Sequence, residues 1–547
     1  MPNERVLPPS GLALIAFLAL PAAADDPGAR IATQGTPGGT VACATCHGQN
    51  GGGDEGAAFP RLAGLNEGYL ARQLRAFRDG GRDHPIMSPM AKPLTDAEVA
   101  AVSAYYAALP AISNAKPPQE LSTVVGGVLA TEGDWANRAL PACAQCHARD
   151  GLGAGEAFPA LAGQVYSYIL AQLEAWVQGK RNADPHGLMS PIAPRLSLDE
   201  ARSVAAYYAG MEVEPGRASG VKQGAGVPAG SAHPSQPGIG PAQTQAAAHL
   251  PASPPIDHGP VDPGRSQGAE ELFQPPARGT APNDPMGDAI RLGEAIFVGT
   301  FSHPESARYV GNTQTCEGCH LDAGRLAGAA PMWAAWVAYP AFRTKDHRIN
   351  SIVERIQGCF TYSMNAPASA VGHAPEADSA TLVALQSYIY WLATGAPTGD
   401  TRMPGRGYPA LNPTPQGFDP DRGARVYRAV CAVCHGSGGQ GTWARGELLF
   451  PPLWGPQSYN WGAGMHRVDT AAAYIRHNMP LGPAQRLSDQ DAWDVAAFIN
   501  AQERPQDPRF KGNLAETARL YHAGHYDYYG KRLGPDGKTL GDEPAGR

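Results

Sequence analysis

The sequence predicts an all-α chain of four small domains, grouped in two halves that a flexible linker joins. Three observations lead to this prediction. The 547 residues are too many for one hydrophobic core. The short unit C-x-x-C-H occurs four times along the chain, with apolar residues at helical spacing around it. A stretch rich in proline, glycine and alanine separates the second unit from the third.

The first 24 residues have the pattern of a secretory signal. Arg5 precedes an apolar stretch from Gly11 to Leu20, and Ala22–Ala24 form a small-residue cleavage site before Asp25. An uncleaved anchor is the alternative, but the stretch is too short to span a bilayer. We therefore expect export to the periplasm. The net charge of −7 and the lack of basic runs argue against nucleic acid as a partner, and we expect no membrane span in the mature form.

Eight of the nine cysteines belong to the four C-x-x-C-H units, and only Cys359 is left over. In c-type attachment the two thiols form thioethers with the porphyrin, and the adjacent histidine binds the iron axially. A redox dithiol or half of a zinc site would explain one such unit, but not four in an exported chain. The sequence thus predicts four covalently bound haem c groups, attached at Cys43, Cys46 and His47; Cys143, Cys146 and His147; Cys316, Cys319 and His320; and Cys431, Cys434 and His435.

The first half contains an internal repeat, which predicts two similar domains over residues 25–115 and 116–211. The pattern F-P-x-L-A-G follows both units, at Phe59–Gly64 and at Phe158–Gly163. Each repeat then ends in a helix that a capping box opens, formed by Thr95 with Glu98 and by Ser197 with Glu200.

Methionines are the predicted sixth iron ligands in three domains. The first repeat offers Met87 and Met90, but the second has Ile192 opposite Met90, which leaves Met87 paired with Met189. For the fourth unit we predict Met479, with Met465 and His477 as competitors. The alternative is that these methionines only fill the core.

The second half follows a predicted linker over residues 212–284. Helical spacing from Ala289 to Phe297 precedes the third unit, and an aromatic helix from Leu382 to Leu392 closes a domain over 285–400. A fourth domain over 401–510 repeats this plan, with helices at Gly423–Val430 and Ser488–Asn500, and residues 511–547 are expected to form a tail.

The third domain has no methionine in a comparable loop and carries Cys359 instead. If residues 348–365 are helical, Arg348, Arg355, Cys359 and Ser363 share one face, where they would form a pocket for a small oxyanion beside a thiol. The alternative is that Cys359 is an ordinary buried thiol, that Met364 or another residue binds the iron, and that the arginines face solvent.

Two resemblances bear on these alternatives. Residues 25–211 resemble the tandem dihaem cytochromes of the c4 type, including the dihaem partner of thiosulfate dehydrogenase. The region from Cys316 to Met479 is similar to the catalytic subunit of that enzyme, through C-x-x-C-H-L, an arginine-rich stretch and C-F-x-x-S-M-N. The chain thus resembles a natural fusion of the two, and the resemblance implies class I-like cytochrome c domains.

The resemblance also implies roles for residues. Cys359 would be the axial ligand of the active-site haem, Arg355 and Ser363 would line the pocket, and Arg348, Arg343 or Lys345 would be the second cation. Some members carry a lysine before the last ligand methionine, whereas this chain has Asn478, which argues against a ligand switch there.

The implied activity is that of a cytochrome c-linked thiosulfate dehydrogenase, which couples two thiosulfates reversibly to tetrathionate. Cys359 would hold the first thiosulfate as a sulfur–sulfur adduct. Electrons would pass through the fourth haem to the N-terminal domains, and then to a soluble cytochrome or a high-potential iron–sulfur protein. Two alternatives are a non-catalytic multihaem electron-transfer subunit and a thiosulfate-carrying cytochrome of a sulfur-oxidation complex.

Overall fold

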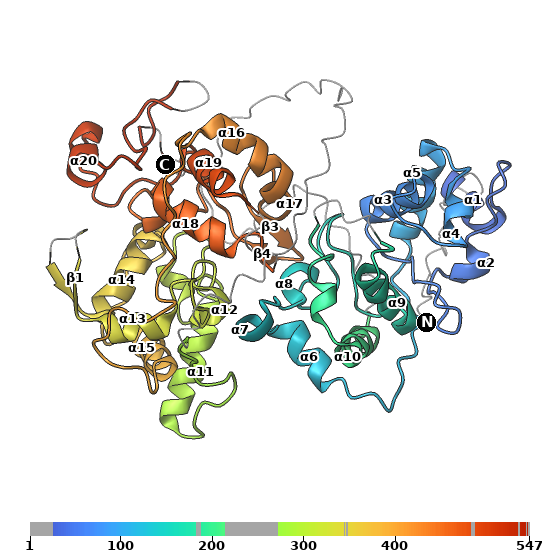
Figure 1. Cartoon of the computed structure of the whole chain (residues 1–547), viewed down its shortest axis with the longest axis horizontal. Coiled ribbons are helices and arrows are strands. Elements are labelled where there is room, and N and C mark those ends of the chain that lie inside the picture. Colours follow the sequence, from blue (N-terminus) through green and yellow to red (C-terminus); the bar gives the residue numbers. More distant parts are fainter. Residues whose placement is uncertain are drawn as a thin grey trace, which may run out of the picture.

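The computed structural model describes residues 26–181, 187–213, 272–343, 345, 348–482, 487–533, 537–542 and 544. The predicted signal segment and most of the predicted linker lie outside these residues. The described chain is predominantly helical, which confirms the all-α class, and its named strands form two short antiparallel hairpins. Figure 1 shows the helices gathered in two groups, one from each half of the sequence. Among the described helices, none combines the length and the apolar character needed to cross a membrane.

The N-terminal half contains two domains with the same order of helices. The first domain comprises α1 (Pro27–Gln34), α2 (Ala44–His47), α3 (Glu67–Arg78), α4 (Met87–Ala91) and α5 (Asp96–Ala108). The second comprises α6 (Val124–Thr131), α7 (Trp135–Arg138), α8 (Ala144–His147), α9 (Tyr166–Val177), η2 (Ala193–Arg195) and α10 (Leu198–Ala209). The two predicted capping boxes open α5 and α10, as expected.

The C-terminal half contains two larger domains. The third comprises α11 (Pro285–Val298), η3 (Ala307–Tyr309), α12 (Leu321–Gly324), α13 (Met332–Ala338), the hairpin of β1 (Ala341–Arg343) and β2 (Arg348–Asn350), α14 (Ile352–Tyr362), η4 (Ala366–Ala368) and α15 (Ala380–Leu392). The fourth comprises α16 (Pro420–Val426), the π-turn η5 (Tyr427–Cys431), α17 (Ala432–His435), the hairpin of β3 (Thr442–Ala444) and β4 (Glu447–Phe450), η6 (Gly464–His466), α18 (Val468–Asn478), α19 (Asp489–Asn500) and α20 (Leu514–Tyr521).

In all four domains the first helix crosses the closing helix at a glycine. A Cβ atom on this glycine would lie only 1.9–2.2 Å from a backbone carbonyl oxygen of the partner helix. A side chain there would therefore push the two helices apart. The glycines and the residues whose carbonyl oxygens they face are Gly28 and Ala101, Gly126 and Ser203, Gly293 and Ala384, and Gly423 and Asp494.

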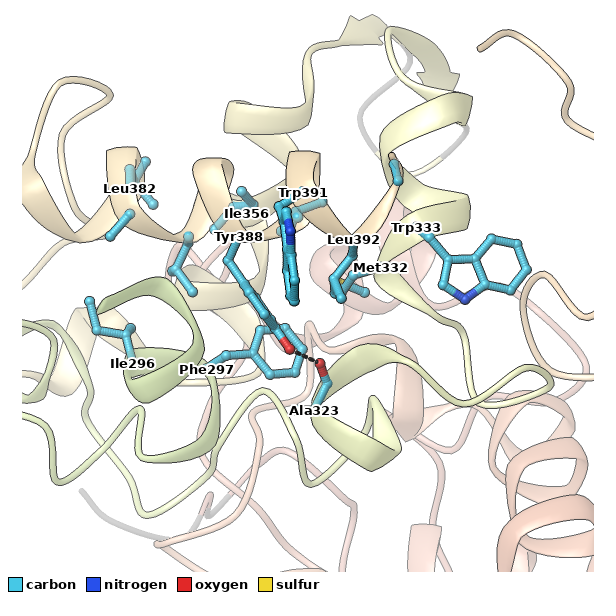
Figure 2. Close-up of a cluster of buried hydrophobic side chains, with 14 of the residues drawn as sticks. Ile296, Phe297, Ala323, Met332, Trp333, Ile356, Leu382, Tyr388, Trp391 and Leu392 are labelled. Carbon is cyan, nitrogen blue, oxygen red and sulfur yellow. Dashed lines mark hydrogen bonds between the residues drawn. The ribbon is translucent and has the colours of Figure 1, made fainter. Parts of the chain in front are cut away.

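The core of the third domain fixes the chain just after its C-x-x-C-H unit. Phe297 on α11 packs against Tyr388 on α15, with ring centroids 5.7 Å apart, and both side chains are buried. The Tyr388 hydroxyl donates a hydrogen bond of 2.8 Å to the carbonyl oxygen of Ala323, as the dashed line in Figure 2 shows. This bond holds α12, and with it the position of His320, against the closing helix.

Two segments depart from the predicted boundaries. Residues 272–284, which the sequence assigns to the linker, pack on the third domain. The ring centroids of Phe273 and Trp333 lie 5.2 Å apart, and Arg278 forms an ion pair of 2.9 Å with Asp322. The expected C-terminal tail forms α20 and packs on the fourth domain, where Tyr529 is buried. Apolar and aromatic side chains in both segments explain why they dock.

The second and fourth domains contact each other directly. Arg445, in the turn between β3 and β4, forms a bidentate ion pair with Asp150, with both nitrogen–oxygen distances 2.6 Å. Beside it the rings of Phe158 and Phe450 lie 5.5 Å apart. Figure 1 shows this hairpin at the boundary between the two halves.

Candidate active site and haem sites

The four histidines of the C-x-x-C-H units each form the same kind of hydrogen bond. In each, the ring Nδ1 bonds to a backbone carbonyl oxygen downstream, so Nδ1 carries the proton and Nε2 keeps its lone pair for a metal. In three domains the carbonyl belongs to the proline that follows a phenylalanine, which gives the F-P repeat a structural role. The pairs are His47 with Pro60 at 3.0 Å, His147 with Pro159 at 2.8 Å, His320 with Ala330 at 2.7 Å and His435 with Pro451 at 2.8 Å.

None of the eight motif cysteines is paired in a disulfide, and their surroundings fit covalent haem. Burial raises the pKa of Cys43 to about 11 and that of Cys431 to about 12. In the N-terminal half, one cavity of about 860 Å³ is lined by both C-x-x-C-H units and by apolar side chains. Paired thiols, a histidine with an available Nε2 and an apolar cavity are what haem c requires.

The predicted methionine ligands lie near these units, and their competitors do too. Met87, at the start of α4, and Met189 both line the cavity of the N-terminal half, as does Met90. Met479, Met465 and Cys431 all pack against the core of the fourth domain. The choice of ligand therefore stays a prediction.

Cys359 lies on α14, one helical turn after Arg355. Arg355 Nη1 donates a hydrogen bond of 2.9 Å to Cys359 Sγ. Burial opposes ionisation of this thiol, but Arg355, His320 and Arg343 outweigh it and lower the pKa of Cys359 to about 6. The buried motif thiols of the same domain behave oppositely, because burial raises the pKa of Cys316 and of Cys319 to about 12. The neighbouring positive charges therefore favour the thiolate form of Cys359.

Further cations surround the same end of α14. Lys345 Nζ lies 3.4 Å from the centre of the Tyr362 ring, and the Arg509 guanidinium lies 5.4 Å from it. Burial lowers the pKa of Lys345 to about 7, and the charges of Arg509, Arg343 and Arg355 add to the effect. The site therefore holds several cations close together, which favours an anionic ligand.

The expected place of Arg348 on the helix is wrong. Arg348 belongs to β2, and α14 begins only at Ile352, because Ser351 and Glu354 form a capping box there. The Arg348 side chain is 59% exposed and pairs with Glu354 over 3.0 Å. Arg343, which the family resemblance offered as an alternative second cation, contributes instead to the lowered pKa of Cys359.

Ser363 follows α14 directly and lies one turn beyond Cys359, as expected. The Ser363 backbone N–H donates to the Cys359 carbonyl over 2.8 Å, and the Ser363 carbonyl accepts a hydrogen bond of 2.8 Å from Asn312 Nδ2. Asn460 of the fourth domain donates to the carbonyl of Thr361 and to Asn365 Oδ1, each over 3.0 Å. The fourth domain thus holds the end of the cysteine helix in place.

Sequence reasoning missed Arg509 and Tyr408. Arg509 lies far along the chain, beside the predicted boundary of the fourth domain. Tyr408 donates to the carbonyl of Cys319 over 3.2 Å, and burial raises its pKa well above the usual value. No local pattern marks either residue, because only the packing of the fourth domain and its C-terminal segment brings them to the site.

Three family models match four parts of the chain. The model "Cytochrome c" matches residues 27–109 and 137–211. The model "SoxA/TsdA, cytochrome c domain" matches residues 307–398, and "Cytochrome C oxidase, cbb3-type, subunit III" matches residues 418–499. Each match includes one or two of the domains described above.

Single relatives match the two halves separately, and one solved structure matches both halves together. A thiosulfate dehydrogenase from Thiomonas intermedia is 49% identical over 276 residues, which are 50% of this chain and 84% of that protein. A thiosulfate dehydrogenase electron acceptor from Stutzerimonas stutzeri is 46% identical over 204 residues, which are 37% of this chain and 93% of that protein. The solved structure of thiosulfate dehydrogenase (TsdBA) from Marichromatium purpuratum is 50% identical, covers 95% of this chain and 99% of its own, and superimposes with a TM-score of 0.81.

Proposed function

The chain belongs to the thiosulfate dehydrogenase family, and we propose that its third domain couples two thiosulfate dianions to one tetrathionate dianion, with release of two electrons. The chain joins this catalytic unit to a c4-like acceptor in one polypeptide. One observation supports the site above all others: Cys359 Sγ accepts a hydrogen bond from Arg355 within a cluster of cations.

The residues of the pocket explain how two dianions can meet. The terminal sulfur of the first thiosulfate bonds to Cys359 Sγ, and two electrons leave. The terminal sulfur of the second thiosulfate then attacks the sulfur bound to Cys359, which forms tetrathionate and returns the cysteine thiolate. Arg355, Arg343 and Lys345 offset the repulsion between the dianions.

Four haem c groups, held by the motif cysteines and histidines, supply one-electron carriers when bound. The chain's own contribution is to place the sites against one another. Cys434 of the fourth domain and Cys146 of the second belong to one apolar cluster around Phe158 and Phe450. We therefore assign the passage between the halves to the contact of the fourth domain with the second.

The downstream partner meets the first domain in this proposal. Val41 and Ile86 border the cavity at the first C-x-x-C-H unit and are 54% and 44% exposed. Apolar residues around an exposed cofactor edge suit brief contact with a soluble cytochrome or a high-potential iron–sulfur protein. A periplasmic location agrees with the signal pattern in residues 1–24.

The test replaces the cysteine and measures product. Cys359→Gly should abolish tetrathionate formation from thiosulfate while the intact mass still accounts for four haems, because this thiol lies outside every attachment unit. Thr361→Gly, on the same helix, controls for the effect of glycine on α14 and should retain activity.

The same assay separates the alternatives. Free tetrathionate formed by the purified protein, without a carrier protein, excludes both a passive electron-transfer subunit and a thiosulfate carrier. Near-normal turnover by the Cys359→Gly variant would rule out the proposed nucleophile.

A further inference from the structure

Two histidines and a carboxylate meet in a buried cluster that the proposed chemistry does not use. His466 lies on η6, and His522 and Asp527 lie in the segment after α20. Their side chains are 7%, 0% and 3% exposed, respectively. Among the described residues, this trio is the group of histidine, cysteine and acidic side chains whose ligand atoms converge as in a metal site.

The outer nitrogen of each ring is already engaged. His466 Nδ1 bonds to the carbonyl oxygen of Ala463, and His522 Nε2 bonds to Asp507 Oδ2 over 2.8 Å. Both acceptors require a proton on the ring nitrogen that faces them. In neutral imidazoles, the lone pairs therefore lie on His466 Nε2 and His522 Nδ1.

These two lone pairs point at the same carboxylate. Asp527 Oδ2 lies 2.6 Å from His466 Nε2 and 2.8 Å from His522 Nδ1, and the two nitrogens are 3.3 Å apart. The other oxygen, Oδ1, accepts the backbone N–H of Tyr529 over 3.1 Å, which fixes the carboxylate. With neutral rings, three electron-rich atoms face one another with no proton between them.

We propose that His466, His522 and Asp527 bind a divalent transition-metal ion, and that this ion is zinc. One point can lie about 2.0–2.1 Å from all three atoms, which is the bond length of zinc to nitrogen and oxygen. Two imidazoles and a carboxylate suit zinc. The outer-nitrogen bonds to a carbonyl and a carboxylate are the second shell that metal-binding histidines have.

The site joins the C-terminal segment to the fourth domain and, through it, to the catalytic pocket. Asp507 Oδ2 contacts His522 Nε2 over 2.8 Å and pairs with Arg509 Nη2 over 2.6 Å. Arg509 in turn lies over Tyr362 at the end of the cysteine helix. The ion would therefore hold the segment that places Arg509 beside the pocket.

A network without metal is the competing arrangement. With Asp527 ionised, it needs protons on both inner nitrogens. Two imidazolium rings would then be buried, that of His522 between Asp507 and Asp527 and that of His466 between the Ala463 carbonyl and Asp527. The two arrangements differ in metal content, which can be measured directly on the haem-loaded protein without reference to its activity.

The experiment is elemental analysis of the untagged, haem-loaded protein from zinc-supplemented medium, with haem iron as the internal standard. We expect about one zinc per four irons, and an anomalous peak at the zinc edge beside His466 Nε2 in crystals. Asp527→Asn keeps the size of the side chain and should lose the zinc while retaining haem. His525→Ala, at an exposed histidine nearby, should keep both.

Less than about 0.1 zinc per chain in the wild-type protein, with no uptake of added Zn²⁺ by equilibrium dialysis, would overturn the proposal. Zinc that stays at full stoichiometry in the Asp527→Asn variant and gives no anomalous peak at His466 would overturn it as well. Stoichiometric copper or nickel at this position would support the site and reject zinc as its ion.

Discussion

At the residue scale, Arg355 is the main charge that lowers the pKa of the Cys359 thiol. Its guanidinium lies 2.9 Å from Cys359 Sγ, where it stabilises the thiolate and remains close enough to bind the oxygens of an incoming dianion. Arg355→Ala should therefore cost about 2–4 kcal/mol in transition-state stabilisation. Steady-state kinetics with thiosulfate would measure it, with Arg402→Ala, at an exposed loop position, as the control. Unchanged kcat/KM would remove Arg355 from the pocket.

Arg343 and Arg348 provide a matched comparison, because they occupy opposite positions in the backbone register of the β1–β2 hairpin. Arg343 acts on Cys359, whereas Arg348 is exposed and pairs with Glu354. We expect Arg343→Ala to raise KM for thiosulfate about tenfold, and Arg348→Ala to change it less than about twofold. A larger loss from Arg348→Ala than from Arg343→Ala would restore Arg348 as the second cation.

Lys345 should make substrate binding depend on pH. Burial and the neighbouring arginines lower its pKa to about 7, so the ammonium is charged below pH 7 and loses its charge above it. The affinity for the thiosulfate dianion should then fall as the pH rises from 6 to 8. Lys345→Met should bind thiosulfate more weakly at pH 6 and show a flatter profile. An identical pH profile for KM in the variant would contradict this role.

The sequence could predict the contact between Arg355 and Cys359 because it is local. Residues four apart on a helix meet, and this spacing is visible in the sequence. Lys345 and Arg509 reach the pocket from a hairpin loop and from the C-terminal segment. Such contacts depend on tertiary packing, which spacing along the chain does not encode.

At the element scale, a capping box in the sequence marks the start of α14. The capping boxes of the two closing helices in the N-terminal half predict where those helices begin, and α5 and α10 begin there. Ser351 with Glu354 is the same signal, and it starts α14 after Arg348. A helix that continued across this box would put Arg348 on the face of Cys359, whereas the observed helix contains Cys359 and leaves Arg348 in β2.

The cap of α14 should control how firmly the cysteine helix is held. Ser351→Ala removes the hydroxyl that accepts the Glu354 N–H over 3.2 Å, and this loss should cost about 0.5–2 kcal/mol of local stability. Hydrogen exchange followed by mass spectrometry should show faster exchange in the peptide that covers 352–362. The peptide that covers 380–392, on α15, is the internal reference. Equal protection in wild type and variant would show that packing alone fixes α14.

At the scale of the whole molecule, the halves are more than tethered. The proline-rich composition of residues 212–284 predicted a linker between independent units. Arg445 and Asp150 nevertheless form a bidentate pair between the halves, beside Phe158 and Phe450. The sequence could not predict this contact, because it joins residues almost 300 positions apart. The contact brings together the Phe-Pro segments that follow the C-x-x-C-H units of the second and fourth domains.

Severing the chain after Gly240 should separate the effects of tether and interface. The C-terminal half should keep its chemistry, but reduction of the N-terminal haems should become dependent on concentration, because the tether supplies an effective concentration on the order of millimolar. Arg445→Ala should weaken the association of the severed halves by about 1–2 kcal/mol. Asp150→Ala should cost less, since it removes the ion pair but leaves the hydrogen bond from Arg445 Nη1 to the Gly153 carbonyl. In the intact chain, either variant should slow the transfer much less. Stopped-flow reduction by thiosulfate at several protein concentrations would measure these rates, and the double variant should be no worse than Arg445→Ala alone. Additive losses, or an isolated N-terminal half that thiosulfate reduces unaided, would contradict this assignment of the interface and of the catalytic domain.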